Sequence, residues 1–382
     1  MRVLFSSTRG TGHFTPLVPL IDACLRGGHE VLVAGPPPLA PTVEARGYPF
    51  WQGANPPEDE LGEAWGRVPT VSPEEANAIV VGEIFGRLNV RAMLPRLMAA
   101  CEDWRPDVLI REQAEFAGAI AAERHDIPHA RLAVSFGLLD AQGLEFARPP
   151  LESEEAGIVE RIWESPYLTF VPPGMEAVDA ARPPVVHRFR DPTVRARETP
   201  SVEQPLVYVS FGSVAAEMPV APALWAGVLE AAEGLPARVL LALGNREADV
   251  AALGMLPPNV RVETWVNPGE VLAEASAAVS HGGFGTTLGA IGAGLPLVVV
   301  PLFGDQPDTA RAVEAAGPGV ALWPNPDGPP APLRSSIDAA GLRGAITTVL
   351  EQPDYRQVAS RLAAEMAEQA PADRVLDALR LT

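Results

Sequence analysis

The chain has 382 residues, of which 47% are hydrophobic and 20% charged, and its formal charge at pH 7 is −19. This length exceeds the usual size of a single hydrophobic core, so two domains are expected. The acidic balance argues against nucleic acid and against an anionic membrane as partners, because both need a basic surface. All 29 basic residues are arginine, which excludes chemistry that needs a lysine, such as a Walker A loop or a Schiff base to pyridoxal phosphate.

The apolar runs are too short to span a bilayer, and the first residues lack the charged-then-apolar pattern of a secretory leader. A soluble cytoplasmic protein is therefore expected. The two cysteines, Cys24 and Cys101, do not have the spacing of a disulfide framework or of a metal site. Cys24 lies on the apolar stripe of a predicted helix, where a buried thiol is expected.

A strand, a helix and a second strand open the chain. Residues 2–6 form a short apolar run, and apolar residues then recur at helical spacing from 17 to 25. Gly27 and Gly28 end that helix, and residues 29–34 are apolar again. This order predicts the first unit of a parallel, doubly wound sheet.

The same sheet is expected to continue with strands at 107–110 and 130–134, separated by a helix at 116–124. Two stretches, 51–104 and 138–164, are acidic, aromatic and partly helical. An α/β scaffold usually carries its binding loops in such insertions, so both stretches are candidates for ligand contact.

A stretch rich in proline, arginine and short polar residues, from 172 to 205, predicts an interdomain linker. The alternation then restarts, with strands expected at 206–211, 238–243, 260–264, 277–280 and 297–300. The predicted fold class is therefore α/β, with two Rossmann-like, doubly wound parallel sheets facing across a cleft. The expected domains are 1–190 and 206–361, joined by the linker proper at 191–205, with a C-terminal helix at about 362–382 packing back on the first domain.

The loop after the first strand, Gly10-Thr11-Gly12-His13, starts like a dinucleotide-binding fingerprint. The third small residue of that fingerprint is missing, and the second strand ends without an acid, so no nicotinamide or flavin is expected. The loop instead places an imidazole at the carboxyl end of a strand, where it can accept a proton from an incoming hydroxyl. A helix-capping histidine without chemistry is the alternative interpretation.

A second glycine cluster, Ser-His-Gly-Gly-Phe-Gly-Thr-Thr at 280–287, again follows a strand and precedes a helix. Its three glycines let the backbone approach a ligand, and the helix start offers free N–H groups to an anion. His281 and Thr286 can add hydrogen bonds, so a diphosphate could be held there without a metal. The alternative is a glycine-rich turn that serves packing alone.

Two further strand ends carry polar or aromatic side chains. Asp305 and Gln306 follow the next strand, and a carboxylate beside an amide suits sugar hydroxyls. Trp265 follows another strand and could stack on a nucleobase. Each of these residues could also be explained by packing or by helix capping.

Together these motifs resemble the inverting glycosyltransferases of the two-Rossmann-domain (GT-B) architecture. That family includes plant secondary-metabolite enzymes and the bacterial glycosyltransferases of macrolide, enediyne and aromatic polyketide antibiotics. The resemblance covers nearly the whole chain. It rests on Gly-His-x-x-Pro-Leu at 12–17, Val-Ser-Phe-Gly-Ser at 209–213, Trp-Val at 265–266, His-Gly-Gly-x-Gly-Thr-Thr at 281–287 and Pro-Leu-Phe-x-Asp-Gln at 301–306.

The resemblance implies a nucleotide diphosphate sugar bound by the second half and an acceptor alcohol or phenol bound by the first. His13 would be the catalytic base that deprotonates the acceptor, with inversion at the anomeric carbon. Glu112 would orient the base, and Glu115 competes for this role. The donor site implied by the family comprises Ser213, Trp265, Val266, His281, Gly282, Gly283, Gly285, Thr286, Asp305 and Gln306.

Gly289 stands where plant relatives carry a glutamate that holds both ribose hydroxyls. This departure favours a thymidine diphosphate deoxysugar over a uridine diphosphate sugar. No cofactor and no metal are expected beside this co-substrate. The acceptor side is expected to be large, flat and apolar, and its candidate residues are Gly12, Trp65, Phe85 and Phe136, with Trp51, Phe116 and Trp163 in or beside the same stretches.

Three other functions are compatible with this pattern. A sugar-nucleotide 2-epimerase and a lipid-linked cell-wall transferase share the architecture, although the latter would be expected to show a basic or apolar patch. A non-catalytic helper that binds a sugar nucleotide would not need His13 beside an acid. A homodimer is left open as the oligomeric state.

Overall fold

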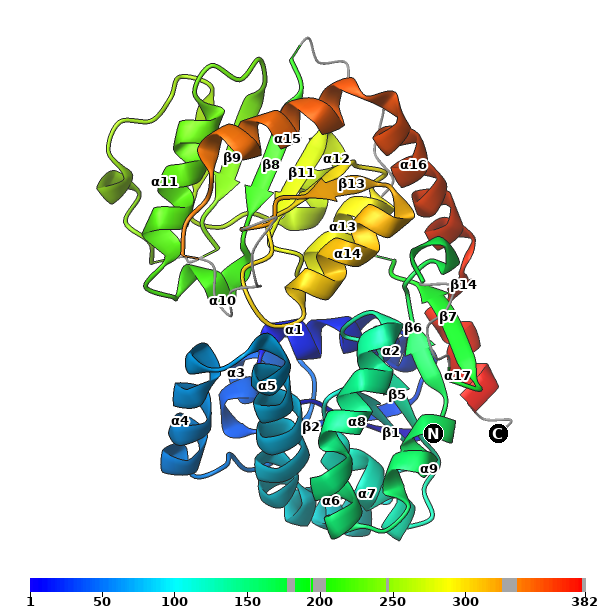
Figure 1. The fold of residues 1–382 in the computed structure, drawn as a ribbon. Coiled ribbons are helices and arrows are strands. Elements are labelled where there is room, and N and C mark those ends of the chain that lie inside the picture. Colours follow the sequence, from blue (N-terminus) through cyan, green and yellow to red (C-terminus); the bar gives the residue numbers. More distant parts are fainter. Residues whose placement is uncertain (177–182, 193, 195–203, 245–246, 325–334, 380–382) are drawn as a thin grey trace. The chain divides into compact units, whose positions relative to one another are not determined.

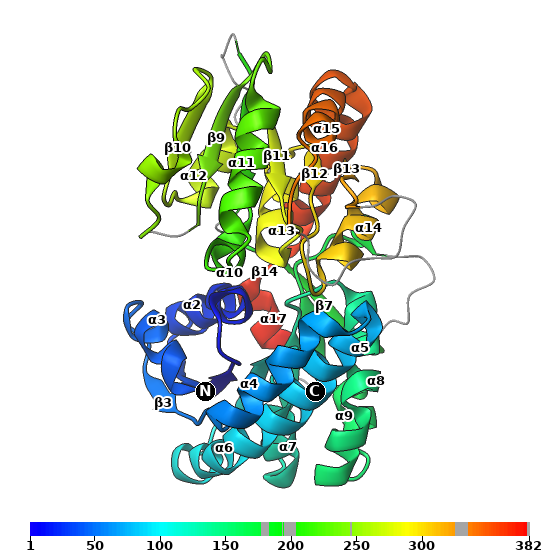
Figure 2. The same cartoon turned by 60° about the vertical axis from the view of Figure 1, so that its left-hand side comes forward.

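The structure is a computed structural model. It describes the whole chain except residues 177–182, 193, 195–203, 245–246, 325–334 and 380–382, and except the side chains of 137–139. The chain divides into two compact units. Unit 1 comprises Met1–Phe170, Val178–Pro192 and Gln369–Thr382, and unit 2 comprises Val171–Ala177 and Thr193–Glu368. Each unit contains its own parallel sheet (Figures 1 and 2).

The sheet of unit 1 has the strand order β14-β7-β6-β5-β4-β1-β2-β3, and every pair in it is parallel. Its strands are β1 Arg2–Ser6, β2 Glu30–Gly35, β3 Phe50–Gln52, β4 Val108–Glu112, β5 His129–Leu132, β6 Tyr167–Thr169, β7 Val186–Arg190 and β14 Ala370–Pro371. Strand β1 lies in the interior of this sheet, between β2 and β4. Its apolar residues Val3, Leu4 and Phe5 are completely buried, as expected for a strand covered on both faces.

The register of β1 and β4 decides which loops meet at the carboxyl edge of this sheet. Ser6, the last residue of β1, pairs with Arg111 of β4. Glu112 ends β4 one residue later. The segment that leads from β1 to His13 therefore starts beside the loop that follows Glu112. Both lie at the carboxyl edge of the sheet, where open α/β sheets bind ligands.

The helical segments of unit 1 cover its sheet and build the candidate acceptor region. They are α1 Thr11–Phe14, η1 Thr15–Leu17, α2 Val18–Arg26, η2 Pro37–Leu39, α3 Ala40–Glu44, α4 Glu58–Arg67, η3 Val68–Thr70, α5 Pro73–Asn77, η4 Ala78–Asn89, α6 Val90–Trp104, α7 Phe116–Arg124, α8 Gly137–Glu154, α9 Ile158–Glu164 and α17 Ala372–Leu379. The π-type helix η4 packs on α8. The buried face of α2 includes Cys24, which confirms the expected buried thiol.

The sheet of unit 2 has the order β10-β9-β8-β11-β12-β13, again with every pair parallel (Figure 2). Its strands are β8 Leu206–Ser210, β9 Arg238–Ala242, β10 Val260–Glu263, β11 Ala277–Ser280, β12 Leu297–Val299 and β13 Gly319–Ala321. Its helical segments are η5 Pro173–Met175, α10 Gly212–Ala216, α11 Ala221–Ala232, η6 Val250–Leu253, α12 Pro268–Glu274, α13 Phe284–Gly292, α14 Gln306–Ala316, α15 Ala339–Glu351 and α16 Pro353–Glu368. Packing of α11 on α15 and of α13 on α16 completes this unit.

The α/β fold with two parallel sheets was predicted from the sequence and is confirmed. Strand β7 lies inside the proline-rich stretch 172–205, which the sequence analysis interpreted as linker. It pairs with β6 on one side and with the two-residue β14 on the other, so it needs no long apolar run. Most of the linker proper, 191–205, lies outside the described residues.

The C-terminal segment also differs from the expectation. Helix α16 extends to Glu368 and packs on α13 within unit 2, so the part that belongs to unit 1 begins at Gln369 rather than at about 362. Helix α17 follows and packs on α2 and β7. Of the helices in the described ranges, none combines the length and the apolarity that crossing a bilayer would require.

Candidate active site

His13 lies in α1, the short helix that follows the carboxyl end of β1. Gly10, just before this helix, has a φ of 120°, a conformation that residues with a side chain rarely adopt. The backbone N–H of His13 donates to the Gly10 carbonyl oxygen at 3.2 Å. The next residue, Phe14, is completely buried and anchors the turn. The imidazole is left 28% exposed, which makes it accessible to a ligand.

Glu112 is the carboxyl group that contacts this imidazole. Its side chain is completely buried, and Oε2 lies 3.1 Å from His13 Nδ1. The same oxygen accepts a hydrogen bond from the Ala114 N–H at 2.7 Å. Oε1 accepts from the backbone N–H of Thr8 at 3.2 Å and from its hydroxyl at 2.8 Å. These donors fix the carboxylate, and the carboxylate in turn orients the imidazole.

The environment keeps Glu112 ionised despite its burial. Burial alone raises the pKa of this carboxyl, but the charge and hydrogen bond of His13 and the donors of Ala114 and Thr8 outweigh that effect. The pKa of Glu112 is therefore held below its usual value. An ionised Glu112 favours the tautomer with the proton on Nδ1, which leaves Nε2 of His13 as the nitrogen that can accept a proton.

Glu115, the alternative partner in the sequence analysis, makes different contacts. Its Oε2 accepts from the Ser6 hydroxyl at 2.6 Å and from the Gly118 N–H at 2.9 Å, which caps helix α7. Burial raises the pKa of Glu115 to about 6. The geometry therefore favours Glu112 over Glu115 as the acid that faces His13.

The candidate acceptor residues fall into two groups. The Phe85 ring in η4 lies 5.5 Å from the His13 ring, in an edge-on arrangement, and exposed Gly12 adjoins His13 in the chain. Trp65 in α4 is 46% exposed, whereas Phe136 is buried. Phe136 would therefore have to move to contact an acceptor.

The other aromatic residues of these stretches support the core of unit 1. Phe116 is buried, and both Trp51 and Trp163 pack against the apolar cluster around it. Trp51 also donates from Nε1 to the Arg96 carbonyl at 3.1 Å. The sequence analysis expected a flat apolar surface built from several aromatic rings. In the structure Trp65 is exposed and Phe85 lies beside His13, whereas the other rings are buried or pack on the core.

The glycine cluster of unit 2 surrounds His281 at the carboxyl end of β11. A Cβ added to Gly212 would lie 2.9 Å from His281 Cε1, and one added to Gly283 would clash with Nε2. Gly282 has a φ of 90°, and a Cβ there would lie 3.0 Å from a methyl group of Val299. The imidazole therefore lies directly against the backbone at the starts of α10 and α13.

Burial lowers the pKa of His281 to about 4, although a hydrogen bond to the Ser210 backbone opposes the shift. The ring is therefore neutral at physiological pH. A neutral imidazole carries one N–H, and the hydrogen bond to the Ser210 backbone uses it. The ring lies beside the first turn of α13, where helix N–H groups can bind an anion.

The remaining donor-site candidates of this loop cluster are accessible. Ser210 pairs with Ser280 between β8 and β11, so Ser213 in α10 and the His281 loop follow neighbouring strands. Ser213 and Gly285 are exposed, and Thr286 is half-buried. Trp265, after β10, is 47% exposed, and Val266 beside it is half-buried.

Asp305 and Gln306 begin helix α14 after β12. Gln306 is 4% exposed, and its Oε1 accepts hydrogen bonds from the N–H groups of Leu302 at 2.9 Å and Phe303 at 3.1 Å. Its amide oxygen therefore holds its own loop, a role that the sequence analysis did not foresee. Asp305 is half-buried at the helix start.

Two residues that build this site escaped the sequence analysis. Thr8 supplies two hydrogen bonds to Glu112, but a threonine in a loop gives no recognisable signal. Arg111 is completely buried in β4, and an arginine inside an apolar strand is the kind of signal that could have identified it. Within the described ranges, no group of three or more histidine, cysteine, aspartate or glutamate residues is arranged to hold a metal ion.

The chain folds into two α/β units, each with a parallel sheet. One unit carries a carboxylate–imidazole pair and the other a glycine-rich helix start, and this combination defines the class of GT-B glycosyltransferases. Solved structures share this fold. The glycosyltransferase SsfS6 of Streptomyces sp. SF2575, complexed with thymidine diphosphate, superimposes with a TM-score of 0.73 at 26% identity, covering 100% of this chain and 99% of that one. The calicheamicin glycosyltransferase CalG4 gives a TM-score of 0.77 at 24% identity, with coverage of 100% and 97%.

Sequence comparisons identify the family. The N- and C-terminal domain models of the erythromycin biosynthesis protein CIII-like family match residues 23–160 and 226–380. The elloramycin glycosyltransferase of Streptomyces olivaceus is 31% identical, over 98% of this chain and 95% of its own length. The tylactone mycaminosyltransferase of Streptomyces fradiae is 28% identical, over 100% and 92%. The chain belongs to this family of natural-product glycosyltransferases, which confirms the resemblance found in the sequence.

Proposed function

We propose that this glycosyltransferase transfers a sugar from a thymidine diphosphate sugar to a hydroxyl group of a natural-product aglycone, with inversion at the anomeric carbon. The observation that carries the proposal is the contact of 3.1 Å between His13 and the buried, ionised Glu112. Further support comes from the relatives, which include enzymes named for elloramycin and tylactone glycosylation.

His13 is proposed to act as the general base. With Nδ1–H directed at Glu112, Nε2 takes the proton of the acceptor hydroxyl while its oxygen attacks the anomeric carbon. The bond from that carbon to the diphosphate oxygen breaks on the opposite face, so the configuration inverts. Glu112 stabilises the imidazolium that forms and keeps the ring in the productive orientation.

Unit 2 is proposed to bind the donor. The N–H groups in the first turn of α13 and the hydroxyls of Ser213 and Thr286 would hold the diphosphate without a metal ion, with the neutral imidazole of His281 beside them. Trp265 would stack on the base, with Val266 beside it, and Asp305 would accept hydrogen bonds from the sugar. Gln306 would act mainly by holding the loop that carries Asp305.

The nucleotide is proposed to be thymidine diphosphate. At position 289, on α13, a glycine leaves no carboxylate for a ribose 2′-hydroxyl. The complex of SsfS6 with thymidine diphosphate supports this choice.

A non-catalytic sugar-nucleotide-binding protein is the alternative that the site disfavours. Binding alone would not require a base whose acid partner is buried and held by three hydrogen-bond donors.

The test uses mass spectrometry to screen dTDP-sugars against polyketide aglycones, followed by the variant His13→Ala on the active pair. General bases contribute on the order of 100- to 10,000-fold, so a loss of this size is expected. The dissociation constant of dTDP, measured by titration calorimetry, should stay within about twofold, because the proposed nucleotide site is built by unit 2. His125→Ala, which removes another histidine of unit 1, should retain the wild-type rate. Full transfer by His13→Ala would overturn the assignment of the base.

A further inference from the structure

We propose that Glu115 is a second positioning residue for His13, which fixes the segment leading from β1 to the base and adds a negative charge behind the His13–Glu112 pair. This inference rests on the proposed role of His13 as the base. Glu115 is not an alternative partner of the imidazole in this arrangement. It acts on the base through Ser6 and through its charge.

Two parallel clamps join the end of β1 to the loop after β4. The Ser6 hydroxyl donates to Glu115 Oε2 at 2.6 Å, and the Thr8 hydroxyl donates to Glu112 Oε1 at 2.8 Å. All four residues are buried. His13 lies five residues after Thr8 on the same segment, so the clamps fix the point from which the chain leads to the base.

Gly118 shows that the fold keeps room for the Glu115 carboxylate. A Cβ at Gly118 would lie 2.6 Å from both Glu115 Oε2 and Ser6 Oγ. Glycine costs about 1 kcal/mol in a helix relative to alanine, so its presence in the first turn of α7 needs a reason. The close approach of the Gly118 N–H to the carboxylate, at 2.9 Å, supplies that reason.

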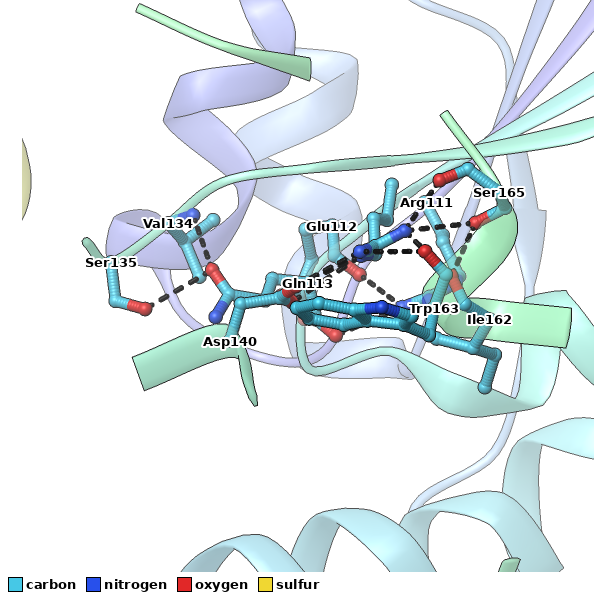
Figure 3. Close-up of polar contacts among 10 residues, drawn as sticks. Arg111, Glu112, Gln113, Val134, Ser135, Asp140, Ile162, Trp163 and Ser165 are labelled. Atoms are coloured by element: carbon cyan, nitrogen blue, oxygen red, sulfur yellow. Dashed lines mark hydrogen bonds and ion pairs between the residues drawn. The ribbon is translucent and has the colours of Figure 1, made fainter. Parts of the chain in front are cut away.

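Arg111 fixes the loop between the two carboxyl groups. Its Nη1 donates to the carbonyl oxygens of Glu112 at 3.2 Å, Gln113 at 2.9 Å and Glu115 at 3.4 Å. The amide oxygen of Gln113 in turn accepts hydrogen bonds from the Val134 N–H and the Ser135 hydroxyl (Figure 3). The loop therefore has little freedom to relax when one carboxyl group is changed.

The charges around Arg111 leave this buried region negative. Arg111 interacts electrostatically with Glu112, Glu115, Asp140 and Arg131. Burial, with the charge of Arg131, lowers the pKa of Arg111 to about 10, so Arg111 remains cationic at neutral pH. In this described group, three carboxyl groups face two guanidinium groups, and Arg131 pairs with Asp140 at 3.0 Å.

His129 also faces Arg111 and Arg131, but burial lowers its pKa, and it pairs with Glu123 at 3.0 Å, so it adds no positive charge at neutral pH. The remaining negative charge favours the imidazolium that His13 forms when it takes a proton. Glu115 contributes this charge above pH 6, because burial raises its pKa to about 6.

The experiment measures the pKa of His13 directly by NMR on the full-length protein with isotope-labelled histidine, the signal being assigned by its loss in His13→Ala. Glu112→Gln is expected to lower the pKa of His13 by about one unit or more, since it removes a charge in direct contact. Glu115→Gln is expected to lower it by about half a unit, a roughly threefold loss of proton affinity. Glu102→Gln, whose carboxyl group is 69% exposed near His125, is the control and should leave it unchanged.

Ser6→Ala is a second variant, in case Glu115→Gln folds poorly. It removes the donor that favours ionised Glu115, so it should also lower the pKa of His13. An unchanged His13 titration in Glu115→Gln or in folded Ser6→Ala, with a shift in Glu112→Gln, would overturn the inference while leaving the base–acid pair intact. The absence of a shift in Glu112→Gln would instead contradict the proposed function. A purely structural role of Glu115 would change stability without moving this pKa.

Discussion

Glu115 illustrates how one side chain can serve the site at the expense of stability. Its carboxyl group is completely buried, and burial raises its pKa from 4.5 to about 6. The protonated form is thus favoured in the folded state, and the resulting stability is fully present below pH 4.5 and lost as the pH rises through 6. A shift of this size corresponds to roughly 2 kcal/mol.

The variant Glu115→Gln should therefore gain stability relative to the wild type at high pH. At pH 8 we expect its free energy of unfolding to exceed that of the wild type by up to roughly 2 kcal/mol, less whatever the weaker amide hydrogen bonds to Ser6 and Gly118 lose. At pH 5 this advantage should fall to less than half, because the wild-type carboxyl group of the folded protein is then largely protonated. Urea denaturation at both pH values checks this, and an equal difference at pH 5 and pH 8 would contradict it.

At the residue scale, the sequence indicated the chemistry of the site better than its geometry. His13, Glu112 and His281 were singled out because each lies at or after the carboxyl end of a strand, which is the edge where open α/β sheets bind ligands. The choice between Glu112 and Glu115 depends on the pairing of Ser6 with Arg111 and on the first turn of α7, neither of which can be read from the sequence. Thr8 acts through its hydroxyl and its backbone N–H, and Ser6 acts through its hydroxyl; such single contacts leave no pattern in the sequence.

At the scale of elements, the close packing of η4 on α8 positions the candidate acceptor residue Phe85. A Cβ at Gly82 would lie 2.5 Å from the carbonyl oxygen of Phe146, and one at Gly86 would lie 3.1 Å from the Cβ of Ala147. Phe85, between these two glycines, is the ring that contacts His13. The distance between the two helices thus determines where this ring lies.

The variant Gly82→Ala should force η4 away from α8. We expect a loss of about 1 to 3 kcal/mol in the free energy of unfolding, because the obstructing atom belongs to the backbone and cannot rotate away. The Michaelis constant for the acceptor should also rise, because Phe85 moves with η4. Gly66→Ala in α4 is the matched control, since that position is exposed and has no atom within 4 Å of the added Cβ.

In the control, alanine should stabilise the helix by up to about 1 kcal/mol. Urea denaturation compares the free energies of unfolding of the two variants. The Michaelis constant for the acceptor reports whether Phe85 has moved. Equal effects of the two substitutions on the free energy of unfolding would show that the packing of η4 on α8 does not require a glycine at position 82.

The sequence predicted the central strands of each sheet but not strand β7, which lies near one end of the sheet of unit 1. Strand β7 has the sequence Val-His-Arg-Phe-Arg, and only Phe189 in it is buried. A strand of this kind is fixed by its neighbours β6 and β14 rather than by its own composition. Segments that depend on distant partners lie beyond what a local pattern can predict.

At the scale of the whole molecule, the alternation of strands and helices was enough to predict two parallel sheets. The assignment of the C-terminal helices was less accurate, because the amphipathic pattern continues through Glu368 into α17 while the chain passes from unit 2 to unit 1. Local periodicity indicates that a helix buries one face, and it does not indicate which unit supplies the partner.

The donor preference of the molecule is expected to depend on one position of α13. Gly289 leaves space beside Leu272, where an added Cβ would lie 3.2 Å from a terminal methyl group that can rotate. Gly289→Glu would supply the carboxylate that plant relatives use for the ribose hydroxyls. A charged hydrogen bond contributes about 1.5 to 3 kcal/mol, so UDP should bind roughly ten times more tightly to this variant than to the wild type.

Titration calorimetry with UDP and dTDP measures this change on both proteins. Affinity for dTDP should rise less, because its sugar lacks the 2′-hydroxyl and offers the new carboxylate one partner fewer. Gly344→Glu in α15 adds the same charge to unit 2 at a position with no atom within 4 Å of the added Cβ, and it should leave the ratio of the two affinities unchanged. Tenfold tighter binding of UDP than of dTDP by the wild type would contradict the proposed thymidine preference, because the discrimination would then not depend on the missing carboxylate.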